Sequence, residues 1–329
     1  MGDVAMTVPV IRAVVEQNPD VKVTFISRPF YKPFFDGINN VTFFDVDLNN
    51  RHKGLLGIFN LYADLKKLNI NAFVDLHNVI RSKIIRNLFS LSGTKVAFTD
   101  KGRTEKKVLT RSKNKIFKPL QPVISRYATT FIKLNIKVDL TQPNIPDKAI
   151  LSEKIVSITG NKGNLKWIGI APFAQYESKV YPKDLMQKVI NELSINNNKI
   201  FLFGGGKKEI EILNQFSRDN KNCIVIAGKL NLKEELELIS NLDVMLSMDS
   251  GNGHIAAMLG VKVITLWGST HPHVGFAPFN QPFENFLTAD RIQFPLIPTS
   301  VYGNINVSGY ENAMRTITVE EIISKINKI

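Results

Sequence analysis

A run of small and polar residues follows an apolar stretch near residue 249, and its residue types suit the binding of an anion. Residues 243–248 are expected to form a buried strand, and Asp249, Ser250, Gly251 and His254 follow at the start of a predicted helix. Ligands of open α/β sheets bind at the carboxyl ends of the strands, and a helix start offers free N–H groups and a positive dipole end. The backbone of Ser250 and Gly251 is therefore predicted to bind a phosphorylated ligand. The alternative is a capped helix with a hydrogen-bonded core histidine.

Three further features are weaker candidates when taken from the residues alone. Lys179 stands before Tyr181, Pro182 and a predicted helix, and it is a candidate phosphate cation or an ordinary surface lysine. Residues 204–206 are three glycines between a strand and a helix, but they match neither G-x-G-x-x-G nor the P-loop, which favours a tight turn. Asp3 lies in a turn before a helix, where a carboxylate commonly stabilises the helix start.

A metal site and a disulfide are not expected. His271 and His273 have no third ligand at plausible spacing, so the segment is interpreted as a loop lining a cleft. Cys223 is the single cysteine, which excludes an intrachain disulfide and a cysteine-based metal cluster. Its apolar surroundings indicate a core position.

Strand-like and helix-like segments alternate along both halves of the chain. This pattern, with short apolar strands, is typical of α/β proteins whose parallel sheet is covered on both faces. In the first half we expect strands at 21–27, 41–46, 72–76 and 95–98, and helices at 7–17, 55–68, 79–91 and 123–134. In the second half we expect strands at 167–172, 199–204, 223–228, 243–248 and 262–268, and helices at 182–193, 207–218, 232–240 and 251–259.

The two halves predict two tandem domains with a cleft between them. A polar stretch without periodicity lies between Asp139 and Asn164, and the boundary is placed within it, giving domains 1–150 and 151–329. A doubly wound domain normally opens on a buried strand, yet this sequence begins in loop and helix. We therefore expect the first strand of the N-terminal domain to be missing; the alternative is a differently built sheet.

The composition is that of a globular protein with a basic surface. The chain has 329 residues, 44% of them hydrophobic, and a formal net charge of +13. No apolar run is long enough to span a bilayer, and no signal peptide is apparent, which predicts a cytoplasmic protein. Residues 101–118 hold eight basic residues and one glutamate. They are either a solvated mobile loop or a surface for an anionic membrane, a phosphorylated acceptor or nucleic acid. Phe117 is the only aromatic residue there, which argues against nucleic acid.

Several motifs in fixed order resemble glycosyltransferase family 9, the heptosyltransferases of lipopolysaccharide core assembly. They are GDVAMTVPVIRAV at 2–14, DLHNVIRSKIIRNL at 75–88, SKVYP at 178–182, DSGNGHIAAMLG at 249–260 and AMRTITVEEI near the C-terminus. The resemblance covers nearly the whole chain, and the DSGxxH loop and the GDV start are its more specific parts. It implies two Rossmann-like domains in the GT-B arrangement.

For the donor site, the resemblance implies roles for five residues. Lys179 would face the donor diphosphate, although Tyr181 stands where the family usually has tryptophan in its K-x-W-P motif. Asp249 would contact hydroxyls of the donor sugar, and His254 would support the loop or the phosphates. The glycine loop, with Gly205, would face the nucleotide, and Glu209 would hydrogen-bond the ribose.

For catalysis and the acceptor, the resemblance implies that Asp3 is the general base on the acceptor hydroxyl. Thr7 is placed on the same helix face, with an ordinary surface role as the alternative. Arg81 matches the family's R-S pair and is expected to bind acceptor carboxylates or phosphates, unless it is a plain surface arginine.

The resemblance thus predicts an inverting, metal-independent glycosyltransferase without a cofactor. The donor would be a nucleotide-sugar, ADP-heptose, held by the C-terminal domain, and the acceptor a lipid-linked saccharide held by the N-terminal domain. The C-terminal helix is expected to pack back on the N-terminal domain. We also expect peripheral contact with the inner face of the cytoplasmic membrane, no nucleic acid, and a monomer. The alternatives are a sugar-nucleotide epimerase of the same fold and a non-catalytic two-lobed sugar-nucleotide-binding protein.

Overall fold

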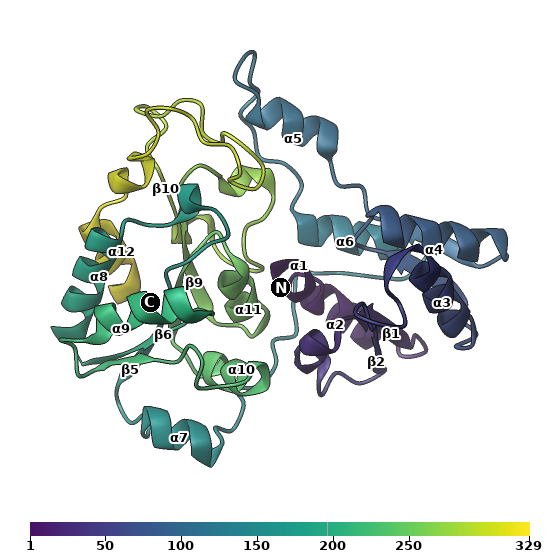
Figure 1. Cartoon of the computed structure of the whole chain (residues 1–329), viewed down its shortest axis with the longest axis horizontal. Helices are drawn as coiled ribbons and strands as arrows, with labels where there is room; N and C mark the ends of the chain where they lie inside the picture. The colour runs from purple at the N-terminus through teal and green to yellow at the C-terminus, as the bar shows by residue number, and fades with distance from the viewer. Residues whose placement is uncertain (196) are drawn as a thin grey trace. The chain divides into compact units, whose positions relative to one another are not determined.

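The structure is a computed structural model that describes residues 1–195 and 197–329 (Figure 1). The chain forms two compact α/β units. The first consists of Met1, Met6–Gly102 and Gln121–Asn144, and the second of Gly2–Ala5, Arg103–Leu120 and Ile145–Ile329. The chain thus leaves the first unit for the last time at Asn144, near the boundary expected at 150/151. Two earlier segments, one with Asp3 and one with most of the basic run, belong to the second unit.

The first unit is built from two parallel strand pairs and four helices. The strands are β1 (Val23–Ser27), β2 (Val41–Asp45), β3 (Ala72–Asp75) and β4 (Lys95–Phe98), and the helices are α2 (Val8–Gln17), α3 (Gly54–Lys66), α4 (Ile80–Leu91) and α6 (Val123–Ile132). β1 pairs with β2 and β3 with β4, as two separate sheets. Leu61 of α3, Phe73 of β3 and Phe89 of α4 meet in one apolar core.

The second unit contains a six-stranded parallel sheet in the order β10-β9-β8-β5-β6-β7. Its strands are β5 (Lys166–Ala171), β6 (Asn198–Leu202), β7 (Cys223–Val225), β8 (Val244–Met248), β9 (Lys262–Trp267) and β10 (Phe286–Thr288). Its helices are α1 (Gly2–Ala5), α5 (Arg103–Thr110), α7 (Glu153–Thr159), α8 (Lys183–Ile195), α9 (Lys207–Ser217), α10 (Leu232–Ser240), α11 (Gly251–Met258) and α12 (Val319–Asn327). The prediction of an α/β protein with a parallel sheet is confirmed.

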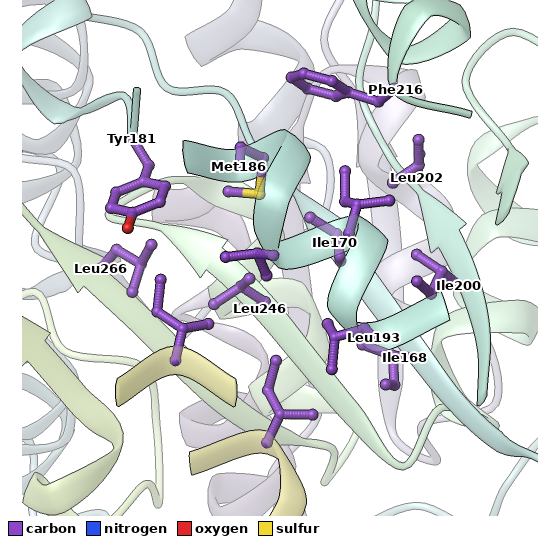
Figure 2. Packing of buried hydrophobic residues seen from close by; sticks show 14 of the residues in the cluster. Ile168, Ile170, Tyr181, Met186, Leu193, Ile200, Leu202, Phe216, Leu246 and Leu266 are labelled. Atoms are coloured by element: carbon purple, nitrogen blue, oxygen red, sulfur yellow. The ribbon is translucent and has the colours of Figure 1, made fainter. Parts of the chain in front are cut away.

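Alternation along the strands assigns one face of this sheet to a single core. Every second strand residue, such as Ile168, Ile170 and Leu202, packs with apolar residues of α8, α9 and α12. Figure 2 shows Ile168 beside Leu193 of α8 and Leu202 near Phe216. Helices α10 and α11 pack against one another, and α11 packs on β8 and β9. Burial on both faces explains why the strands are continuous apolar runs rather than alternating ones.

The strand order fixes where a ligand would be expected. From the central β5 the chain proceeds outward to β6 and β7, then returns to β8 on the other side of β5. The loops after β5 and β8 therefore diverge, and this topological switch point is where open α/β sheets bind ligands. Lys179 follows β5 and Asp249 follows β8.

Several elements differ from those expected. The basic run contains helix α5, which buries Lys106 and Leu109, so this part is not a mobile loop. Helix α7 lies in the polar stretch expected to lack periodic structure, and β10 was not predicted. The C-terminal helix α12, expected on the N-terminal domain, packs against α8 through Ile322 and Ile326 of the second unit's core. Among the described residues, no helix is long and apolar enough to cross a membrane.

Candidate functional site

The loop between β8 and α11 leaves the first turn of α11 uncapped. Asp249 is buried, and Ser250 is extended, with φ −152° and ψ 175°, at the N-cap position. The Ser250 side chain makes no capping hydrogen bond, and its buried Oγ has no partner within the described part of the chain. The first N–H groups of a helix have no partner within the helix, and a buried hydroxyl needs one, so this helix start is suited to an anionic ligand.

Two glycines allow the chain to pass closely over this loop. A Cβ on Gly253 would lie 2.5 Å from the Ser247 hydroxyl oxygen. A Cβ on Gly2 would lie 3.1 Å from Cδ2 of His254 and 3.4 Å from the Cα of Gly251. Helix α1 therefore packs directly on the start of α11, which brings Asp3 into the second unit beside His254.

Lys179 and Asp249 form a buried ion pair at the switch point. The Lys179 Nζ lies 3.2 Å from Oδ2 of Asp249, and both side chains are about nine-tenths buried. The same Oδ2 accepts a hydrogen bond of 2.8 Å from the hydroxyl of Thr270, which follows β9. Three successive loops at the carboxyl edge of the sheet thus supply one polar cluster, and Thr270 is a member that sequence reasoning missed.

The hydrogen bonds of Ser178 and the close approach of Gly303, together called the bracket below, hold the stem of Lys179. The Ser178 hydroxyl donates to the carbonyl oxygen of Gly303 at 2.6 Å and accepts from the Ser269 hydroxyl at 2.7 Å. Gly303 has φ +84°, and a Cβ there would lie 2.7 Å from Cγ and 2.8 Å from Cδ of Lys179. Only glycine fits both this conformation and this contact. Gly303 therefore positions Lys179.

Tyr181 anchors the same segment from the other side. Its ring is fully buried, and its hydroxyl donates to the carbonyl oxygen of Ile317 at 2.7 Å. Burial raises the pKa of the Tyr181 hydroxyl to about 12, so this donor stays protonated. The tyrosine in place of the family's tryptophan thus ties the Lys179 segment to the chain that leads into α12.

Burial and the nearby carboxylates shift the pKa of His254 in opposite directions. Burial lowers the pKa of His254, while the charges of Asp249 and Asp3 oppose that effect. Its Nδ1 is buried and has no hydrogen-bond partner within the described residues. Asp3 itself is exposed. The site thus holds a neutral imidazole with a free ring nitrogen beside an accessible carboxylate.

Tyr302 lies near Asp3 and was not predicted as a site residue. It precedes Gly303 and is half-exposed, and its ring lies 5.8 Å from that of Phe276. Burial raises the pKa of the Tyr302 hydroxyl, with a smaller contribution from Asp3 and an opposing one from Arg103. The Lys106 Nζ lies 4.3 Å from the centre of the Phe276 ring. Helix α5 therefore places Lys106 against Phe276 and Arg103 near Tyr302.

The glycine turn after β6 is held by the residue expected to bind ribose. The Gly205 N–H donates to Oε2 of Glu209 at 2.7 Å. Gly205 is exposed, with nothing within 4 Å of a Cβ built on it. Glu209, in the first turn of α9, thus holds the glycine turn through this hydrogen bond.

Thr7 and Arg81 belong to the first unit. Thr7 is buried before α2, and Arg81 is partly exposed in the first turn of α4. A nearby ion pair was not predicted: Nη1 of Arg86 lies 3.3 Å from Oδ2 of the buried Asp75. Asp75 also accepts from the Asn78 N–H at 2.6 Å, which fixes the loop that follows β3.

His271 and His273 pack with the end of the basic run. The centre of the Phe117 ring lies 4.9 Å from that of the His271 ring and 3.3 Å from the Arg291 guanidinium. Lys115 Nζ donates to the carbonyl oxygens of Leu296 and Pro298. Burial, with some help from neighbouring cations, lowers the pKa of His271 to about 3. Across the residues that the structure describes, no group of three or more histidine, cysteine, aspartate or glutamate side chains is placed to hold a metal ion.

A parallel α/β sheet with a buried lysine, a buried aspartate and a helix start at its switch point is an arrangement suited to a phosphorylated ligand. The family model described as glycosyltransferase family 9 (heptosyltransferase) matches residues 58–293. The chain belongs to this family and is a glycosyltransferase.

Known proteins resemble the chain over most of its length. It is 26% identical to the lipopolysaccharide core heptosyltransferase OpsX of Haemophilus influenzae over 345 residues, covering 100% of this chain and 94% of the relative. It is 27% identical to lipopolysaccharide heptosyltransferase 1 of Campylobacter coli, covering 82% of each. A family 9 glycosyltransferase from Veillonella parvula has the same fold, with a TM-score of 0.75 at 16% identity over 99% of this chain and 93% of that one. Heptosyltransferase WaaC of E. coli with ADP gives 0.68 at 16% identity over 99% and 96%. The predicted GT-B class is confirmed by these folds.

Proposed function

We propose that the protein transfers a heptose, or a related sugar, from ADP-heptose to a lipopolysaccharide-core-type acceptor. The observation that carries this proposal is the pairing of Lys179 with Asp249 beside the uncapped start of α11. The names of the relatives give the sugar and the acceptor class, since two are lipopolysaccharide heptosyltransferases. One structural neighbour is WaaC with ADP, and another WaaC structure holds ADP-2-deoxy-2-fluoro heptose.

The donor would be bound chiefly through its diphosphate. The N–H groups of Ser250 and Gly251 would donate to phosphate oxygens at the positive end of α11. Lys179 would exchange part of its interaction with Asp249 for the diphosphate, which frees Asp249 to accept hydrogen bonds from sugar hydroxyls. Glu209 would accept from the ribose hydroxyls. Charge that develops on the leaving diphosphate would be stabilised by groups already in place.

The transfer would be a single displacement. Asp3 would take the proton of the acceptor hydroxyl as its oxygen bonds to the anomeric carbon, and the bond from that carbon to the phosphate oxygen would break. ADP leaves with the bonding electron pair, and attack from the opposite face inverts the anomeric configuration. Lys179 and the helix start supply the positive charge that the leaving group needs, so we propose a metal-independent reaction without a cofactor.

Acceptor binding is assigned to Thr7 and Arg81 of the first unit, and membrane contact on the cytoplasmic side to the basic run. Only some lysines of that run are exposed and could contact a membrane surface. Lys106 is buried against Phe276 and Lys115 is bound to main-chain carbonyls, so neutralising either one would disturb packing. Lys107, Lys113 and Lys118 are exposed and are the residues to neutralise.

The test combines donor selectivity with two variants. Thermal unfolding is measured with ADP-, UDP- and GDP-sugars, and ADP release is then measured with a lipopolysaccharide-core acceptor in the presence of EDTA. We expect stabilisation by ADP-sugars, activity that survives EDTA, and a kcat lowered about 10²- to 10⁴-fold by Asp3→Asn. Lys179→Gln should lower kcat about 10²- to 10³-fold, whereas the exposed Asp20→Asn should have no effect. Conversion of the donor without any acceptor would instead identify an epimerase.

A further inference from the structure

Helix α3 of the first unit is apolar on two sides. Its inner face buries Ile58 and Leu65 in the core of the unit. On its outer side Leu55, Leu56 and Phe59 are 72%, 80% and 54% exposed. Leu55 and Phe59 are four residues apart and so lie on the same edge of the helix. Three large exposed apolar side chains on one helix form a patch of the kind that marks an interaction surface.

The loop before α3 is fixed firmly to the helix. A Cβ on Gly57 would lie 2.2 Å from the carbonyl carbon of His52, so the loop passes directly against the helix. Asp64 accepts from Arg51 at 2.6 and 2.7 Å, and it also lies 3.1 Å from Lys67 Nζ. These hydrogen bonds lower the pKa of Asp64 well below its usual range. The exposed edge is therefore displayed on an ordered support.

The charges near this edge are positive. Between Asp47 and Asp64 the sequence holds no acidic residue. The Asp47 carboxylate accepts hydrogen bonds from the main-chain N–H groups of Asn49 and Asn50. Asp64 is paired with Arg51 and Lys67. Lys53, at the N-cap of α3, and Lys66, at its last residue, are both exposed. Lys66 follows Phe59 by two helical turns and so lies on the same side. An apolar edge between lysines matches the interface of an anionic bilayer, where lysine heads reach the phosphates and the apolar side chains enter below them.

We propose that the edge formed by Leu55, Leu56 and Phe59 inserts into the surface of an anionic lipid layer. The contact is peripheral, because α3 has 13 residues and its inner face belongs to the protein core. This inference rests on the proposed function only in that a lipid-linked acceptor gives the first unit a reason to lie at a membrane.

The test uses the full chain and vesicles of phosphatidylethanolamine with phosphatidylglycerol. The variant combines Leu55→Ser, Leu56→Ser and Phe59→Ser, and its matched control combines Ile150→Ser and Ile292→Ser, which are 94% and 93% exposed in the second unit. We expect the α3 variant to lose about tenfold or more in vesicle partitioning, since each side chain loses apolar burial. The control should bind as the parent does. Activity toward a delipidated acceptor should be unchanged by the α3 variant and reduced only with acceptor in vesicles.

A spectroscopic readout covers the case in which the triple variant folds poorly. Trp167 and Trp267 are buried and out of reach of lipid, so a vesicle-dependent change in the emission of Phe59→Trp reports on the introduced tryptophan. Its emission should shift to the blue when the anionic vesicles are added, and that of Ile292→Trp should not. Equal vesicle binding by the triple variant and its control would overturn the proposal, as would unchanged emission from Phe59→Trp. A dimer that Leu55→Ser dissociates without any change in lipid binding would instead show a self-association surface. If the parent protein transferred no sugar to the delipidated acceptor, only the proposed function would be contradicted.

Discussion

Gly303→Ala tests whether the bracket around Lys179 positions this cation. The introduced Cβ would lie 2.7 Å from Cγ and 2.8 Å from Cδ of Lys179, distances that force one group to move. At φ +84° alanine adds strain of about 1 kcal/mol, which should lower the Tm by about 2 to 4 °C. The stem of Lys179 is the flexible partner, and we expect its Nζ to move by roughly 1 Å.

The cost to catalysis follows from Coulomb's law and from alignment. At an effective dielectric constant of about 20, moving a cation from about 4 to about 5 Å from an anionic oxygen loses about 1 kcal/mol, or about fivefold. Misplacement by about 1 Å can cost as much as about 100-fold when alignment matters. We therefore expect kcat to fall between about 5- and 100-fold, with an unchanged acceptor KM.

Gly309→Ala is the matched control, because it separates backbone strain from displacement of the lysine. Gly309 has φ +83°, and nothing lies within 4 Å of a Cβ built there. Both variants should lose similar stability in thermal unfolding, but only Gly303→Ala should lose kcat in the ADP-release assay. Equal kcat values for the two variants, with Gly303→Ala folded, would refute the positioning role.

Three further predictions concern buried groups. Thr270→Val removes a hydrogen bond to Asp249 and should raise the donor KM about 3- to 10-fold, measured by ADP release. Folding lowers the pKa of His271 from about 6.5 to about 3, so the free energy of unfolding falls as the pH falls below about 6.5. In denaturant titrations at about pH 5, His271→Gln should avoid about 2 kcal/mol of this loss. Burial raises the pKa of Glu235 to about 7, so the free energy of unfolding falls as the pH rises from about 4.5 through 7. The stability of Glu235→Gln relative to the parent should therefore rise by about 2 to 3 kcal/mol from about pH 4 to about pH 8.

The sheet of the second unit could be predicted because its information is local. Strands such as β5 and β8 are apolar runs bounded by helices whose own pattern is amphipathic, so neither needs distant residues to be recognised. The polar loop after β8 follows from the same pattern. Asp249 and His254 could be placed in that loop because the polar residues begin where the strand ends.

The rest depends on contacts between distant segments. The bracket joins Ser178 to Gly303 across 125 residues, and no periodicity links them. Helix α5 has a highly charged sequence and hides Lys106 beneath Phe276, which the basic composition of the run did not indicate. Strand β10 has only three residues, too few to show an alternating pattern. These features can be recognised only in the three-dimensional structure.

The lone thiol of Cys223 has a consequence for how the enzyme tolerates its surroundings. Burial in β7 raises the pKa of this thiol to about 12, so at neutral pH the nucleophilic thiolate is scarce. Alkylating reagents and peroxide react with thiolates, and they therefore find almost no target in the folded enzyme. We expect sugar transfer to proceed equally well with and without reductant, and the protein to form no mixed disulfides on storage in air.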